Sequence, residues 1–290
     1  MSMTRMASTV VHTAVEAMLR PPRTVAEMLR MLDGPVDLTG RTILLTGASS
    51  GIGEAAAHLL ARRGATVIAV ARTPETLRAT CDAITEAGGI AHPLTADLSD
   101  PDDARRLAAE VLDRFGPPDV LINNAGRSIR RSAVDTVDRF HDYERTMALN
   151  YFGPVALILG LLPAMIDAGR GHIVNVVTWG VTAGAMPKFA AYHASKAALA
   201  AFGRSLDGEC EGTGVTVTNA GFPLVRTPMI APTSSYDDAP ALTSEQAAQW
   251  LLQAVVDRPA ELYPRYAVAL RAVGAFSPRA VHRLVARVGI

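Results

Sequence analysis

The chain has 290 residues, of which 49% are hydrophobic and 19% are charged, and its formal net charge at neutral pH is zero. This length and apolar content suit one α/β domain with a sizeable core, and the balanced charge argues against a nucleic-acid-binding protein. Cys81 and Cys210 are the only cysteines, too few for a disulfide framework or a cysteine-based metal site. We therefore expect a reducing compartment, with the cytoplasm as the default.

The N-terminal segment, residues 1–38, is predicted to be an added helical arm. Its apolar pairs recur at helical spacing, Pro21-Pro22 ends a first helix, and a second short helix is expected over 25–29. The pattern of a secretory signal is missing. The main domain is expected over 39–256, followed by a tail over 257–290.

From Arg41 onwards, apolar strand patterns alternate with helix patterns. Continuous apolar strands separated by helices predict an α/β fold, a parallel sheet covered by helices on both faces. The expected strands are 42–45, 66–71, 90–95, 120–123, 173–177 and 215–219, and the expected helices are 52–63, 75–87, 101–115, 137–169 and 190–211. The most apolar stretch, 151–166, contains Gly153-Pro154 and Pro163 and is shorter than the roughly 20 residues that span a bilayer, so we expect a buried or subunit-facing helix.

A glycine-rich turn follows the first expected strand. Glycine permits a tight turn and a close approach of the backbone to a ligand, and the N-terminus of the helix that follows attracts an anion such as a diphosphate. The alternative is an ordinary strand-to-helix turn. The candidate dinucleotide-binding residues of this turn are Gly47, Ser49, Ser50, Gly51, Ile52 and Gly53.

The end of the second strand bears on the choice between NADP and NAD. A carboxylate about 20 residues beyond the glycine turn binds the ribose hydroxyls of NAD, whereas an arginine there suits the 2′-phosphate of NADP. Here the strand ends in Arg72-Thr73, and the first acid is Glu75. We predict NADP rather than NAD; the alternative is that Arg72 is a solvated surface charge.

Two further strand ends fit the same ligand. Asp97 and Leu98 could place a carboxylate and an apolar side chain beside an adenine ring, and Asn124-Ala125-Gly126 could lie beside a ribose. Either could also be ordinary turn chemistry. Because strand ends meet at one edge of a parallel sheet, their order along the chain supports the dinucleotide.

Tyr192 and Lys196 lie four positions apart on the last helix before the final expected strand. At this spacing both side chains leave one helix face, so the ammonium can lie near the phenol. A nearby cation favours the ionised phenol and is expected to lower the pKa of Tyr192 from its usual value of about 10. Tyr192 could then exchange a proton with a carbonyl or alcohol oxygen.

In this combination of motifs the chain resembles the short-chain dehydrogenase/reductase superfamily from Arg41 to Met229. The resemblance implies a single Rossmann-type, doubly wound sheet and a homo-dimer or homo-tetramer. It also implies a catalytic tetrad of Asn, Ser, Tyr and Lys, in which Asn150 holds a helix bend and a proton-relay water. Lys196 would also bind the nicotinamide ribose.

Two positions depart from the family pattern. Thr178 stands where the family usually has the catalytic serine; it keeps the hydroxyl and adds a methyl group. If Thr178 does not correspond to the catalytic serine of the family, Thr182 is the next candidate for that role. Pro223 stands near a position where the family commonly has glycine, while Val225 and Thr227 still match residues that contact the nicotinamide carboxamide and the diphosphate.

Within the superfamily, the stretches around Trp179, Met186 and Met229 resemble actinobacterial reductases related to fatty-acyl reductases. The expected substrate cleft is rich in apolar residues that could equally belong to the core. With no spare cation reserved for a carboxylate, the set favours an apolar ketone or aldehyde. The members are Trp179, Met186, Phe189, Phe222, Met229, Ile230 and Trp250.

The sequence thus predicts an NADP-dependent oxidoreductase that moves hydride between nicotinamide and the carbonyl or alcohol carbon of an apolar substrate. Tyr192 would be the acid/base, Lys196 would tune it, Thr178 would orient the oxygen and Asn150 would support the proton relay. The rival is a dinucleotide-binding sensor or scaffold that has lost turnover, which the departures at Thr178 and Pro223 suggest.

The C-terminal tail is basic and amphipathic. Residues 262–290 contain no Asp or Glu, and Arg279, Arg283 and Arg287 recur every four positions after Pro278. A helix there would gather these arginines on one face and four apolar residues largely on the other: Val281, Leu284, Val285 and Val288. Two alternatives follow: a surface helix packed on the core or a neighbouring subunit, or a peripheral contact with an anionic membrane.

Overall fold

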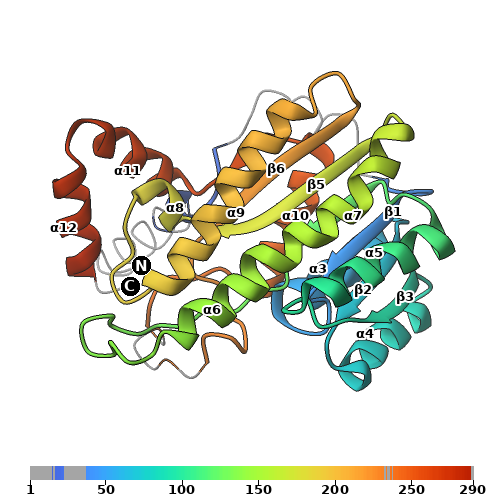
Figure 1. Cartoon of the computed structure of the whole chain (residues 1–290), viewed down its shortest axis with the longest axis horizontal. Helices are drawn as coiled ribbons and strands as arrows, with labels where there is room; N and C mark the ends of the chain where they lie inside the picture. Colours follow the sequence, from blue (N-terminus) through green and yellow to red (C-terminus); the bar gives the residue numbers. More distant parts are fainter. Residues whose placement is uncertain are drawn as a thin grey trace, which may run out of the picture.

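The computed structural model of the protein describes residues 15, 17–22, 37–231, 233, 236 and 238–288. At its centre the described strands form a parallel seven-stranded sheet in the order β3-β2-β1-β4-β5-β6-β7 (Figure 1). The order reverses between β1 and β4, which is where such sheets bind ligands. The strands are β1 (Thr42–Thr46), β2 (Thr66–Ala71), β3 (Ile90–Thr95), β4 (Val120–Asn123), β5 (Gly171–Thr178), β6 (Val215–Phe222) and β7 (Glu261–Leu262).

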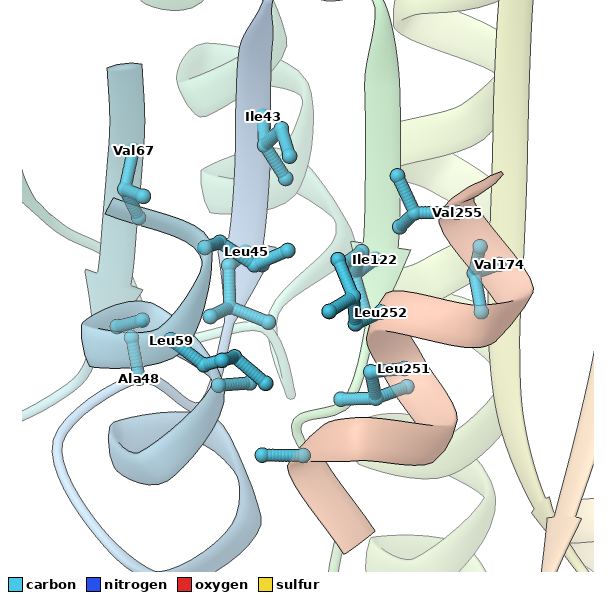
Figure 2. Packing of buried hydrophobic residues seen from close by; sticks show 14 of the residues in the cluster. Ile43, Leu45, Ala48, Leu59, Val67, Ile122, Val174, Leu251, Leu252 and Val255 are labelled. Carbon is cyan, nitrogen blue, oxygen red and sulfur yellow. The ribbon is translucent and has the colours of Figure 1, made fainter. Parts of the chain in front are cut away.

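Helices cover both faces of this sheet because alternate residues of each buried strand point to opposite sides. Ile43 and Leu45 of β1 pack with Leu59 and with Leu252 on one face (Figure 2), whereas Leu44 belongs to the cluster on the other. The first face carries α3 (Gly51–Arg62), α4 (Pro74–Glu86) and α10 (Ser244–Asp257). The second carries α5 (Pro101–Phe115), α7 (Gly153–Asp167) and α9 (Ala190–Glu209).

All six expected strands are present, so the predicted α/β fold with a doubly wound parallel sheet is confirmed. Strands β5 and β6 extend beyond the predicted bounds. The seventh strand, β7, was not predicted and pairs with β6 in parallel. The sheet therefore continues into the segment that the sequence assigned to the tail.

The helix expected over 137–169 begins later, at His141. It consists of α6 (His141–Met147), a π-helical turn η1 (Ala148–Phe152) and α7. These 27 residues are long and apolar enough to cross a membrane by length and composition. Since Leu157, Ile158, Leu161 and Met165 of α7 are completely buried in the core, we interpret the helix as a layer of the fold.

The opposite face of this helix remains open to solvent. Phe152, Leu159 and Ile166 are exposed and follow one another at seven-residue intervals, which places them on one side of the helix. This face is available for the subunit contact that the sequence predicts. The homo-oligomer itself stays a prediction.

The C-terminal segment forms two helices, α11 (Arg265–Phe276) and α12 (Pro278–Val288). Val281 and Val285 of α12 are buried in a third apolar cluster that includes Trp179 and Phe189. Packing on the core, one of the two alternatives for this tail, is therefore confirmed for these two valines. Leu284 and the three arginines of the repeat lie outside that contact.

Part of the N-terminal arm is described. Residues 15 and 17–19 are helical, Leu19 packs against the main core, and the Arg20 carbonyl oxygen accepts a hydrogen bond of 3.0 Å from the Arg265 backbone N–H. This described part of the arm is thereby tied to the start of α11. The second helix expected over 25–29 lies outside the described residues.

Candidate active site

The glycine-rich turn joins β1 to α3 beside the point where the strand order reverses. Gly47 and Gly51 have positive φ angles of 68° and 56°, which glycine adopts without strain. A Cβ atom on Gly53 would lie 1.9 Å from the Gly47 carbonyl oxygen, so this position requires glycine as well. The Asn124 amide donates to the Thr46 and Gly47 carbonyl oxygens at 3.0 and 3.3 Å and holds the turn against the end of β4.

The first turn of α3 faces the same cavity as the glycines. Ser50 is the N-cap residue, and its side chain makes no capping hydrogen bond. Thr227 lies close by, since a Cβ atom on Gly51 would be 3.0 Å from the Thr227 Cγ2 atom. A helix N-terminus with closely packed glycines is a binding site for an anion. This cradle fits the diphosphate of a dinucleotide, with α3 on one side and Thr227 on the other.

Charged groups at the ends of β2 and β3 extend this site. Arg72 and Thr73 are exposed after β2, where Thr73 is the N-cap of α4. The Asp97 carboxylate accepts hydrogen bonds from the Ser99 hydroxyl and backbone N–H at 2.6 and 3.0 Å. These bonds, with weaker help from the charges of Arg72 and Arg127, lower the pKa of Asp97 despite partial burial. An ionised Asp97 close to Arg72 matches the expected adenosine end.

Helix α9 carries the predicted catalytic pair, Tyr192 and Lys196. The Lys196 Nζ atom donates a 2.8 Å hydrogen bond to the Val176 carbonyl oxygen of β5. Burial lowers the pKa of Lys196 to about 8, because an ammonium loses its hydration there. A Cβ atom on Gly126 would lie 3.3 Å from Nζ, so the glycine after β4 leaves space beside the ammonium.

The expected lowering of the pKa of Tyr192 is wrong. Burial raises the pKa of this phenol to about 12, and only the hydrogen bond with the Thr178 hydroxyl acts in the opposite direction. The cost of removing a phenolate from water outweighs that stabilisation. At neutral pH, Tyr192 is therefore a protonated phenol, which is the form that donates a proton.

Thr178 rather than Thr182 occupies the position beside Tyr192. Thr178 ends β5, lines the cavity and shares a hydrogen bond with the Tyr192 phenol. Thr182 lies on the short helix α8 (Gly180–Ala183), and its hydroxyl donates to the carbonyl oxygens of Trp179 and Ala267 at 2.8 and 3.3 Å. Its hydroxyl is directed to backbone, so Thr178 is the better match to the family serine.

Asn150 lies in the π-helical turn η1, where the helix departs from α geometry as the sequence resemblance implies. Its amide accepts from the Arg127 N–H and donates to the Arg127 carbonyl oxygen, both at 2.8 Å. It also donates at 3.0 Å to the Ser195 hydroxyl, which in turn donates at 2.7 Å to the Tyr192 carbonyl oxygen. Ser195, which the sequence analysis missed, thus connects Asn150 to the turn of α9 that carries Tyr192.

One cavity of about 240 Å³ joins the glycine turn to the catalytic pair. Its walls include a set of predicted cofactor or catalytic residues: Gly47, Ser50, Gly51, Ile52, Asn124, Ala125, Gly126, Thr178, Tyr192, Lys196, Val225 and Thr227. Other predicted residues do not line it: Ser49, Gly53, Arg72, Thr73, Asp97, Leu98 and Asn150. Of these, Leu98 is buried in the core cluster that covers one face of the sheet, and its contact with an adenine ring stays a prediction.

The substrate side of the cavity is apolar. Six of the seven predicted apolar residues line it: Trp179, Met186, Phe189, Phe222, Met229 and Ile230. The seventh, Trp250, belongs to the core on α10 and stacks on Phe222 at 5.3 Å between ring centroids. Tyr236 completes the wall but was not predicted, since no motif marks it.

Arg127 is a cation on the cavity wall that the sequence analysis overlooked. Arg127 directly follows Asn124-Ala125-Gly126, and this position after β4 is the sequence feature that could have marked it as a cavity residue. Its charge also makes a small contribution to the lowered pKa of Asp97, so this cation lies at the cavity and acts on the end of β3.

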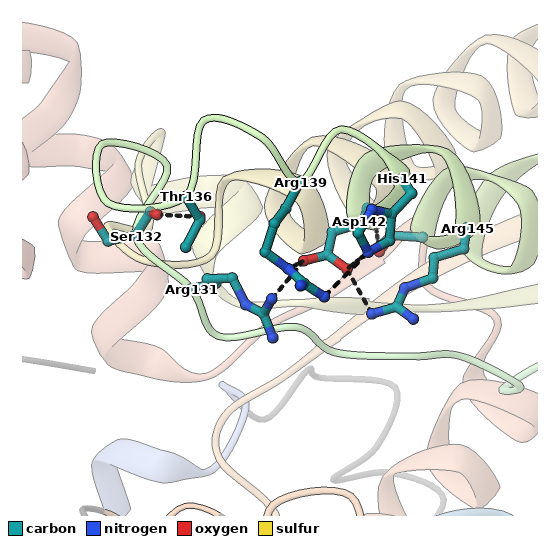
Figure 3. A network of polar contacts seen from close by, with 8 residues as sticks. Arg131, Ser132, Thr136, Arg139, His141, Asp142 and Arg145 are labelled. Atoms are coloured by element: carbon teal, nitrogen blue, oxygen red, sulfur yellow. Dashed lines mark hydrogen bonds and ion pairs between the residues drawn. The ribbon is translucent and has the colours of Figure 1, made fainter.

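The loop that follows Arg127 is held by one buried carboxylate, Asp142 of α6. Arg131, Arg139 and Arg145 reach this carboxylate at 3.2, 3.2 and 2.5 Å (Figure 3). The Arg131 N–H also donates at 2.6 Å to the Lys188 carbonyl oxygen, which links the loop to the segment of Met186 and Phe189. This network ties the loop to α6 and to the segment that carries Met186 and Phe189, two residues of the cavity wall.

The departure at Pro223 does not divert the chain. After β6 ends at Phe222, Val225 forms a parallel bridge with Leu242, and both Val225 and Thr227 reach the cavity. Despite the missing glycine, the chain brings these two residues to the cavity, and their contacts with the cofactor stay a prediction.

Comparison with known proteins gives a consistent result. A model of the short chain dehydrogenase family matches residues 41–238. A fatty acyl-CoA reductase of Mycobacterium tuberculosis is 50% identical over 270 residues, which cover 93% of this chain and 92% of that protein. A fatty acyl-CoA reductase of Acinetobacter baylyi is 48% identical over 77% of this chain and 75% of its own length. The crystal structure of a metagenomic short-chain oxidoreductase in complex with NADP has a TM-score of 0.67 and 32% identity, covering 78% of this chain and 97% of that one.

Proposed function

Since this chain belongs to the short-chain dehydrogenase/reductase family, we propose that it is an NADPH-dependent reductase of the carbonyl group of apolar, lipid-like substrates. The observation that carries this proposal is the single cavity that joins the glycine turn, the Tyr192–Lys196 pair with Thr178, and an apolar wall. Relatives named fatty acyl-CoA reductases support the substrate class.

The cofactor would supply the hydride, and the chain would hold it along the strand ends. The diphosphate would rest on the first turn of α3 opposite Thr227, and the 2′-phosphate would lie beside Arg72. Lys196, held by the Val176 carbonyl oxygen at 2.8 Å, would reach the nicotinamide ribose. The ammonium is thus positioned by backbone before any ligand is bound.

The proton would come from Tyr192. Its raised pKa, about 12, keeps the phenol protonated at neutral pH, so the pair is set for reduction. Thr178 would hold the substrate oxygen within reach of the phenol. An aldehyde would take up hydride at carbon and a proton at oxygen to give an alcohol. A thioester would take up hydride at carbon, its carbon–sulfur bond would break, and the thiol would leave with the proton.

The apolar wall should select for chain length. Each buried methylene group contributes about 0.8 kcal/mol of binding, so a long acyl chain is preferred over a short one. We expect kcat/KM for a long-chain acyl-CoA or aldehyde to exceed that for a short 2-keto acid by at least about tenfold. NADPH consumption, followed by absorbance across such a panel, measures this ratio.

The same assay separates the enzyme from the rival sensor or scaffold. Tight NADPH binding without turnover of any carbonyl or alcohol in the panel would support the rival. A preference for the short charged acid would instead contradict the proposed substrate class while leaving the reductase assignment intact.

Arg72 supports a further prediction, that NADPH binds at least about tenfold more tightly than NADH. That ratio corresponds to about 1.4 kcal/mol, which one charge-assisted contact with the 2′-phosphate can supply. The Arg72→Ala variant should lose most of the ratio through weaker NADPH binding, with NADH affinity unchanged. Dissociation constants from fluorescence titration measure both. Arg78→Ala, which removes an exposed arginine from α4, is the matched control; equal affinities in the parent protein would refute the preference.

A further inference from the structure

The corner between α11 and α12 exposes apolar side chains to an unusual degree. Phe276, the last residue of α11, is 93% exposed, and Val273, one turn before it, is 52% exposed. Leu284 on α12 is 50% exposed. Ser277 alone separates the two helices, so the exposed side chains come from adjoining parts of the chain. Exposed apolar side chains that gather in one part of the surface are typical of surfaces that meet a partner.

Positive charge surrounds these side chains. Arg279, Arg283 and Arg287 are exposed on α12 at four-residue spacing, and none forms an ion pair with another residue in the described part of the chain. Residues 262–290 contain no Asp or Glu. By contrast, Arg271 of α11 is neutralised by Glu261 at 2.6 Å. Within the described residues, the three arginines of α12 therefore leave a positive charge beside Leu284 and Phe276 that no acidic group pairs with.

The corner adjoins the substrate side of the cavity. Val281 and Val285 on the inner face of α12 are buried in the cluster that contains Trp179, Met186 and Phe189, three residues of the cavity wall. Figure 1 shows α11 and α12 at one end of the molecule, next to α8. One face of α12 thus supports the cavity wall, and its remaining surface carries the arginines.

We propose that the α11–α12 corner docks the protein on an anionic lipid surface. Phe276, Val273 and Leu284 enter the boundary between headgroups and acyl chains, and Arg279, Arg283 and Arg287 pair with lipid phosphates. Exposed apolar groups next to unpaired arginines match the two components of an interfacial site, apolar burial and attraction to anionic lipid. A second copy of the chain would present the same uncompensated positive charge and is disfavoured by repulsion.

Vesicle sedimentation of the full-length protein tests this surface directly. We expect binding to vesicles that contain phosphatidylglycerol at low salt, weaker binding as salt screens the arginines, and little binding to phosphatidylcholine alone. Phe276→Ser, and separately the triple variant Arg279→Gln, Arg283→Gln and Arg287→Gln, should each lower the partition coefficient by at least about tenfold. These residues are exposed, so the variants should fold like the parent. Deleting α12 would be a poorer test, because it also removes the buried Val281 and Val285.

Two controls make the outcome specific. A triple variant Arg78→Gln, Arg105→Gln and Arg114→Gln removes the same charge from α4 and α5 and should bind vesicles like the parent. Reduction of a water-soluble substrate should be unchanged in every variant, so a failed reductase assay and a failed docking assay are distinguishable. The proposal is overturned if the parent does not bind anionic vesicles, if the α12 variants bind as well as the parent, or if Phe276→Ser changes only the oligomeric mass.

Discussion

Replacing Tyr192 by Phe is expected to lower kcat by about 10²–10⁴-fold, the range that a positioned proton donor contributes. The phenol, with its raised pKa, is the protonated group beside Thr178, and Phe keeps the ring but removes its proton. NADPH affinity should stay within a few-fold of the parent value, because the diphosphate cradle on α3 is untouched. Steady-state rates and a fluorescence titration of NADPH measure the two quantities.

The matched control for this variant is Tyr151→Phe. Tyr151 lies in η1 and does not line the cavity, so losing its hydroxyl should leave kcat near the parent value. If Tyr192→Phe keeps its turnover, another group donates the proton and the proposed role of Tyr192 is wrong. If both kcat and NADPH binding collapse, the substitution has disturbed the site as a whole, and the separate proton-donor role proposed for Tyr192 is not supported.

The strands of the central sheet could be predicted from the sequence because each is a short apolar run between helix patterns. Strand β7 could not, since two residues carry no periodicity. Helix α10 is not among the predicted elements, although the sequence carries a local signal for its start. Thr243 and Gln246 form a capping box at its start, a pattern visible as Thr-Ser-Glu-Gln in the sequence.

The location of the candidate cofactor-binding residues at one edge of the sheet could be predicted for a geometrical reason. In a parallel sheet the residues after each strand meet at one edge, so the glycine turn and Asn124 had to lie together. The pKa of Tyr192 was not predictable in the same way. It depends on how the fold shields the phenol from water and on the charge of residues far away in the chain, such as Tyr236, and helix spacing alone reports neither effect.

The hydrogen-bond partners of the site residues could not be predicted from the sequence pattern either. Ser195 was passed over as part of the Tyr-Lys segment, yet it connects Asn150 to the backbone of Tyr192. The sequence predicts Trp250 at the cleft as one of several apolar residues, but large apolar residues are equally common in cores, and Trp250 lies in the core. Its stacking on Phe222 shows that it supports the cavity wall from behind.

Thr178 provides the second large expected effect. Thr178→Val should lower kcat by about 10²-fold, in the range measured when an enzyme loses one donor to a reacting oxygen. Valine keeps the branched shape of threonine, so the change in kcat reports the removal of the hydroxyl that bonds to Tyr192. Thr178→Ser should stay within a few-fold of the parent, because the hydroxyl remains and only a methyl group is lost. Rates for the three proteins with one long-chain aldehyde measure the series.

Thr182→Val is the matched control, and it also tests the competing assignment. The Thr182 hydroxyl bonds to the Trp179 and Ala267 carbonyl oxygens, so its loss should cost about 1 kcal/mol of stability and leave kcat unchanged. Thermal unfolding and steady-state rates separate these two effects. A Thr178→Val variant as active as the parent would remove Thr178 from the catalytic set, and a loss of kcat in Thr182→Val at the same time would assign the role to Thr182. The position of Thr178 at the end of β5, beside the phenol, leads us to expect the opposite pattern.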